Sequence, residues 1–151
     1  MERFTTFDGR IGRQDWWIGI GILFVIALVS ALVIGLIFGD GFFGRLIQLI
    51  VSLVMLALFA GLSVRRLHDR NKAANPWLII FVAPSLVYNV MFLLGIGFTR
   101  IEFMGESVMM PGFLARVVMF ASAVVGIWAL VELGILQGTQ GDNEYGPDPL
   151  Q

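Results

Sequence analysis

A histidine next to an aspartate is the pair in this chain that most resembles catalytic machinery. His68 and Asp69 are adjacent within the run Arg65-Arg66-Leu67-His68-Asp69-Arg70. A carboxylate beside an imidazole can orient the ring for proton transfer, which would allow acid–base catalysis. Neighbouring residues of a helix point about 100° apart, however, and are poorly placed to bond each other. We therefore expect no catalytic site, and an intramembrane enzyme that uses His68 ranks third among the functions considered.

Metal, redox and phosphate chemistry lack their usual residues. The chain has no cysteine and one histidine, so it cannot by itself build a disulfide, a Cys-rich zinc site or an iron–sulfur cluster. It has no glycine-rich loop ending in Gly-Lys-Ser/Thr, and Gly19-Ile20-Gly21 lies in an apolar stretch without a preceding strand. We expect no cofactor, no metal and no nucleic-acid partner, because the basic residues flank apolar segments.

Two polar residues within apolar stretches could serve an ion or a proton. Glu132 is the only acidic residue inside such a stretch, and Asn89 lies in the middle of another. Glu132 follows Arg116 by about 24 Å of helix, which places it within about 6 Å of the far membrane boundary if Arg116 marks the near one. An ion pair with an arginine at that boundary is the favoured interpretation. The alternative is a small oligomeric channel or transporter that uses Glu132 and Asn89.

The composition predicts the elements that carry these residues. Of 151 residues, 58% are hydrophobic and 14% charged, whereas soluble domains have roughly 45–50% and about 25%. This excludes a soluble globular protein. About 20 residues cross a hydrocarbon core, and four stretches qualify: 16–39, 46–64, 76–98 and 114–136. We predict one all-α domain, a polytopic membrane protein with four transmembrane helices, joined by short connections that make neighbours antiparallel.

The distribution of basic residues predicts the orientation. The N-terminal segment and the second connection together hold seven lysines and arginines, one of them Arg3, against three on the other side. By the positive-inside rule, the interfacial segment 1–15, the connection Arg65 to Asn75 and the tail 137–151 are cytoplasmic. Trp16, Trp17 and Trp77 are then expected at the headgroup level. The outer loop from Arg100 to Gly112 is expected to form a small extracytoplasmic hairpin.

Small residues recur every fourth position on the first stretch, at Ala27, Ala31, Gly35 and Gly39. Such a stripe lets another helix backbone approach closely. Packing within the same chain is the favoured interpretation. The alternative is a face for self-association, which would make the protein a homo-oligomer.

Three motifs resemble one family. Phe7-Asp8-Gly9-Arg10-Ile11-Gly12-Arg13, followed by Trp16-Trp17, is similar to the aromatic-x-Gly-Arg-x-x-Arg opening of the bacterial inner membrane proteins grouped as domain of unknown function 805, the YhaH-like proteins. Arg65-Arg66-Leu67-His68-Asp69 resembles their Arg-Arg-Leu-His-Asp block, and Asn143-Glu144-Tyr145-Gly146-Pro147-Asp148-Pro149 their Asn-x-Tyr-Gly-x-x-Pro ending. The resemblance covers essentially the whole chain. It implies a multi-pass protein of the bacterial inner (plasma) membrane and implies no activity.

The predicted topology places all three motifs on the cytoplasmic face, where we expect one polar cap. Its arginines should meet Asp8, Asp69, Glu132 and the tail acids Asp142, Glu144 and Asp148. The candidate cap residues are Arg10, Arg13, Arg65, Arg66, His68, Asp69, Glu132, Asn143 and Tyr145. The leading hypothesis is a non-enzymatic scaffold or interaction protein. Its cap either holds the helices in register or docks anionic lipid headgroups of the bilayer or a membrane protein partner.

Overall fold

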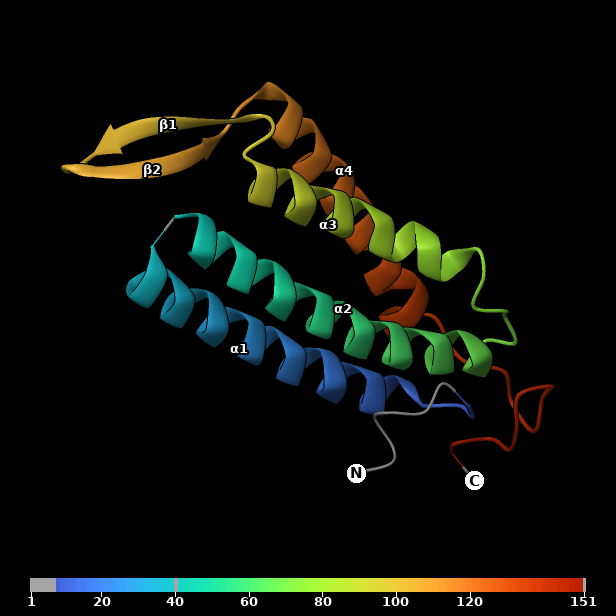
Figure 1. Ribbon diagram of the computed structural model, residues 1–151. Helices are drawn as coiled ribbons and strands as arrows, with labels where there is room; N and C mark the ends of the chain where they lie inside the picture. The colour runs from blue at the N-terminus through green and yellow to red at the C-terminus, as the bar shows by residue number, and fades with distance from the viewer. Residues whose placement is uncertain (1–7, 40, 151) are drawn as a thin grey trace.

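The computed structural model describes residues 8–39 and 41–150; Arg3 lies outside them. The fold is mostly helical (Figure 1). Its elements in chain order are α1 (Arg13–Phe38), α2 (Phe42–Asp69), α3 (Trp77–Leu94), β1 (Phe98–Phe103), β2 (Glu106–Pro111), α4 (Phe113–Ala129) and a π-helical extension, η2 (Leu130–Ile135).

Four helices are long and apolar enough to cross a membrane, as the composition predicted; the fourth is α4 continued by η2. They form two hairpins, α1 with α2 and α3 with α4, and α2 packs against α3 between them (Figure 1). Near one end, η2 returns to contact α1 and α2. An even number of passes therefore brings the described N-terminal residues and the tail to the same end of the bundle (Figure 1).

Helix α2 is longer at both ends than the predicted stretch 46–64. It begins at Phe42 and ends at Asp69, so the Arg-Arg-Leu-His-Asp motif forms the last turns of a helix. The prediction that this motif belongs to a connecting loop is therefore wrong. The predicted stretch ends before Arg65 because that residue is charged. Basic residues are nevertheless favourable in the last turn of a helix, because they lie near the negative end of its dipole. The other helices span 13–38, 77–94 and 113–135, close to the expected stretches.

The expected hairpin between the third and fourth helices is confirmed. Strands β1 and β2 pair antiparallel, with Thr99 opposite Met110 and Ile101 opposite Val108. The turn at its tip contains Met104 and Gly105, both with positive φ. The hairpin extends from the end of the bundle that is remote from the chain termini (Figure 1).

The buried apolar core lies at the end of the bundle where the termini meet. It includes Trp16, Leu62, Leu67, Phe81 and Leu133, and Trp16 is only 1% exposed. Helix α1 turns Trp16 inward against the core, so its ring does not face the surroundings of the bundle, and its level in the membrane stays a prediction. Trp17 is 45% exposed and fits the interfacial position better.

The small-residue stripe of α1 is divided between two surroundings. Ala27 lines a cavity between the helices, whereas Ala31 and Gly35 are exposed and a Cβ added to Gly35 would meet nothing within 4 Å. Packing within the chain, the favoured interpretation of the stripe, is therefore wrong at Gly35. The close approach of α1 to α2 occurs instead at Gly19, where an added Cβ would lie 2.7 Å from Leu62 Cδ1.

Candidate functional site

Asp69 is the centre of a polar cluster at the end of the bundle that holds both termini. Its side chain is 5% exposed and accepts hydrogen bonds from two arginines. Arg10 Nε and Nη2 reach Oδ1 at 3.2 and 3.0 Å, while Arg66 Nη1 reaches Oδ2. Both arginine side chains are 1% exposed. One carboxylate thus lies between two buried guanidinium groups from different motifs.

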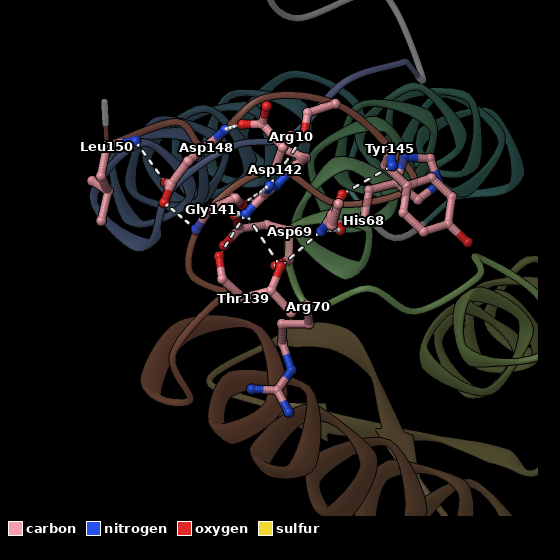
Figure 2. A network of polar contacts seen from close by, with 12 residues as sticks. Arg10, His68, Asp69, Arg70, Thr139, Gly141, Asp142, Tyr145, Asp148 and Leu150 are labelled. Carbon is pink, nitrogen blue, oxygen red and sulfur yellow. Dashed lines mark hydrogen bonds and ion pairs between the residues drawn. The ribbon is translucent and has the colours of Figure 1, made fainter.

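Arg10 connects this centre to the C-terminal tail. Its Nη2 donates to the Thr139 carbonyl at 2.7 Å, and its Nη1 donates to the Gly141 carbonyl at 2.8 Å (Figure 2). Its Nη1 also donates to the Gly146 carbonyl at 3.1 Å. The tail also reaches Asp69 directly, because the backbone N–H and hydroxyl of Thr139 both donate to the Asp69 carbonyl. The guanidinium group of Arg10 therefore bonds to backbone carbonyls of the tail as well as to the Asp69 carboxylate.

The end of η2 is capped by side chains from other helices. A helix leaves its last carbonyls without partners in the helix itself. Here Arg66 donates to the Leu133 and Leu136 carbonyls at 2.7 and 2.5 Å. Trp17 Nε1 donates to the Gly134 carbonyl at 3.1 Å, and Arg13 donates to Ile135 at 3.1 Å. Donors from α1 and α2 thus satisfy four successive carbonyls and hold the negative end of this helix.

Glu132 binds two cations from the α2–α3 connection. Its Oε1 lies 2.8 Å from Arg70 Nε and 2.6 Å from Lys72 Nζ, and its side chain is 7% exposed. Lys72 also lies 4.3 Å from the centre of the Trp77 ring. The arrangement is an ion pair at the end of the bundle. Arg70 was among the cations expected there, but sequence reasoning gave no role to Lys72.

His68 joins the second motif to the tail through its ring. The imidazole stacks on Tyr145 with ring centroids 4.0 Å apart, and His68 Nδ1 lies 3.3 Å from the Gly9 carbonyl. Asn143 Nδ2 donates to the His68 carbonyl at 2.9 Å. Asp69 bonds to arginines and His68 bonds to backbone and an aromatic ring, so the two side chains do not form the catalytic pair that their adjacency could have given.

The tail acids take a different role from the one expected. In the described part of the chain, Asp142, Glu144 and Asp148 form no ion pair with the cap arginines, so that expectation is wrong. Asp148 instead accepts hydrogen bonds from the backbone amides of Leu150 and Gly141. These amides lower the pKa of Asp148 below its ordinary value of 3.8. Asp142 accepts from the Asp148 amide, so these carboxylates shape the tail itself.

We name this cluster the polar cap. Its members among the predicted residues are Arg10, Arg13, Arg66, His68, Asp69, Arg70, Glu132, Asn143 and Tyr145, and the structure adds Thr139 and Lys72. Arg65 is half-buried beside them, and its carbonyl accepts the Ile11 N–H at 3.4 Å.

Two glycines that the motifs do not include are also needed at the polar cap. A Cβ at Gly134 would lie 2.7 Å from Trp17 and 2.8 Å from Trp16, and a Cβ at Gly138 would collide with the Asp69 carboxylate. Glycine lets these backbones approach closely. Only the distant residues they touch reveal the requirement, so single-sequence reasoning had no signal for it.

Asn89 lies apart from the polar cap. It lines an open cavity of about 460 Å³ between the helices, to which all four contribute, and its Nδ2 donates to the Ser85 carbonyl at 2.8 Å. Glu132 is absent from the lining of that cavity. The two residues of the transporter hypothesis therefore belong to separate sites.

Comparison with known proteins places the chain among uncharacterised relatives. A family model described as "Protein of unknown function (DUF805)" matches residues 4–147. The uncharacterized protein YiiR of Escherichia coli strain K12 is 31% identical over 146 residues, covering 95% of this chain and 85% of the relative. YiiR of Escherichia coli O157:H7 matches with the same identity and coverage. No solved structure matches significantly.

Proposed function

Because the chain belongs to the DUF805 family of proteins of unknown function, whose three motifs supply the polar cap, we propose that it is a non-enzymatic scaffold of the bacterial inner membrane. The polar cap holds the helices in register on the cytoplasmic side. The membrane-facing surfaces then meet a second copy or another membrane protein. This is the arrangement that we predicted from the basic residues of the connections.

The observation that carries the proposal is the use of the guanidinium groups of Arg10 and Arg66. Their donors go to Asp69 and to backbone carbonyls of the tail and of η2. Cations satisfied in this way have few donors left for lipid headgroups. Of the two cap functions considered, holding helices in register is therefore better supported than docking of anionic lipid.

The exposed face of α1 supports contact with another protein. Ala31 and Gly35, both exposed, form a surface on which a second backbone could approach closely. A scaffold needs such a surface to be held at a fixed angle. The polar cap provides this, because Arg13 and Trp17 tie the start of α1 to η2.

Photocrosslinking in native membranes tests the proposal. A photoreactive amino acid at Leu32, which is 59% exposed beside the stripe, should give one discrete protein adduct. The same amino acid at Ile127, 63% exposed on α4, is the matched control and should give mainly lipid adducts. Arg10→Gln, which opens the polar cap, should weaken the Leu32 adduct.

Two outcomes would contradict a scaffold. Lipid adducts alone at Leu32 would mean that this face meets only the bilayer. A pH-dependent ion flux in proteoliposomes, abolished by Glu132→Gln without loss of folding, would replace the scaffold with the channel or transporter.

A further inference from the structure

The cavity between the helices lies outside the polar cap, and its lining is uncharged. All four helices contribute to its walls, which are mainly apolar and include Phe24, Phe59 and Phe81. Six uncharged polar side chains also line it: Ser30, Gln48, Ser52, Ser85, Asn89 and Ser122. Its volume of about 460 Å³ is within the range of roughly 300–1,000 Å³ typical of small-molecule pockets.

Part of the polar lining lies at the depth of the hydrocarbon core. Asn89 is about 18 Å along α3 from Trp77 at the cap end, and Ser52 is about 20 Å along α2 from Arg65. Gln48, one turn before Ser52, lies nearer the remote end, close to Arg45. A core about 30 Å thick has no bulk water at that depth. A polar group there needs a partner from the protein, a trapped water or a ligand.

Some of these side chains already have partners within their own helices. Ser30 and Ser122 donate to the carbonyls of Ala27 and Val118 at 3.0 and 2.8 Å. Gln48 differs, because its amide has no hydrogen-bond partner anywhere in residues 8–39 and 41–150. Ser52, one turn further along α2, has no side-chain partner in that part of the chain either. Two unsatisfied polar side chains on one helix thus face a mainly apolar cavity.

We propose that this cavity binds a neutral lipid with a single apolar chain, whose hydroxyl or carbonyl group bonds to Gln48 and Ser52. The absence of charge among the lining residues disfavours an ionic headgroup, which would lack a counterion. The apolar walls suit a hydrocarbon chain better than a row of water molecules, because each buried water needs 2–4 polar partners.

Access from the bilayer is consistent with the helix packing. The main contacts of α1 are with α2 and, near the polar cap, with η2. The cavity nevertheless uses residues of both α1 and α4, such as Leu23 and Gly126. A ligand dissolved in the membrane can therefore enter between these two helices, away from the polar cap.

Competitive photolabelling of the full chain in phosphatidylcholine nanodiscs tests the proposal. The probe is a long-chain alcohol with a diazirine next to its hydroxyl, and the matched probe is the corresponding alkane. The alcohol should label peptides from the cavity walls and be displaced by excess unlabelled alcohol. Gln48→Leu should reduce this labelling about five- to tenfold, the effect expected for one lost hydrogen bond. Gln140→Leu, in the exposed tail, is the control and should change nothing.

The proposal is overturned if the alcohol and the alkane label the cavity equally and without competition. That result would mean a cavity filled by bulk lipid tails or by water. If Gln48→Leu does not fold, labelling of the unmodified chain tests the proposal instead. Labels confined to outward-facing residues such as Leu36, which is 87% exposed, also overturn the proposal. Neither result depends on the Leu32 crosslinking, so failure of the scaffold and failure of the lipid site are distinguishable.

Discussion

Replacing Asp69 by asparagine should destabilise the protein strongly. The change removes the carboxylate that pairs with both Arg10 and Arg66, whose side chains are 1% exposed. Breaking a buried ion pair by removing one partner costs roughly 3–5 kcal/mol, because the surviving charge stays buried. For a chain of about 150 residues this lowers Tm by about 6–20 °C, at roughly 2–4 °C per kcal/mol. Tryptophan fluorescence during thermal unfolding in detergent measures the change.

The matched control is Asp142→Asn. That carboxylate is exposed and accepts only the Asp148 amide in the described structure, at 3.2 Å, so its loss should cost at most about 1 kcal/mol. Arg10→Met combined with Asp69→Asn should cost less than the sum of the single changes, because one of the two orphaned charges is removed. A Tm within about 2 °C of the unmodified protein for Asp69→Asn, or strict additivity in the cycle, would refute the argument that Asp69 neutralises buried cations.

Four further outcomes are expected. Reporter fusions after Ala73 should be cytoplasmic, and an extracytoplasmic signal there would reverse the topology. Gly134→Ala should cost about 1–3 kcal/mol by overpacking against the tryptophans, whereas Gly126→Ala, which meets nothing within 4 Å, should be neutral in the same melt. Gly35→Leu should leave thermal stability unchanged and reduce the oligomer size measured by light scattering; unchanged size would make the stripe lipid-facing. Glu132→Gln should lower stability without creating or removing proteoliposome flux, since two cations lose their partner.

Much of the architecture could be predicted because bilayer thickness sets helix length. Long uncharged stretches gave four helices, and alternating residues with a turn gave the hairpin. The end of α2 could not be predicted in the same way. Arg65 and Arg66 mark the end of hydrophobicity, whereas the helix ends only at Asp69, beyond which the amides of Arg70 and Asn71 bond to the carbonyls three residues earlier. Charge locates a membrane boundary, and it does not locate a helix terminus.

Which residues meet in the polar cap was partly visible in the sequence. The topology brought the three motifs to one end, and complementary charges predicted that Glu132 would bind an arginine. The sequence did not distinguish carboxylates from carbonyls as partners. Arg10 bonds to Gly141 and Gly146 through their backbone oxygens, which every residue has. A contact made through the backbone cannot be predicted from the type of residue at that position.

The extension of α2 through the motif also explains why Arg65 and Arg66 differ although they are adjacent. A helical step of about 100° leaves Arg65 half-buried at the edge while Arg66 is fully buried against η2 and Asp69. Arg66 bonds to Leu133 and Leu136, and these residues follow it by a full hairpin of chain. Asp69 of the same helix pairs with its charge, but these two hydrogen bonds can form only after α3 and α4 are in place. Assembly of the polar cap thus depends on the last helix, which makes the two hairpins one unit.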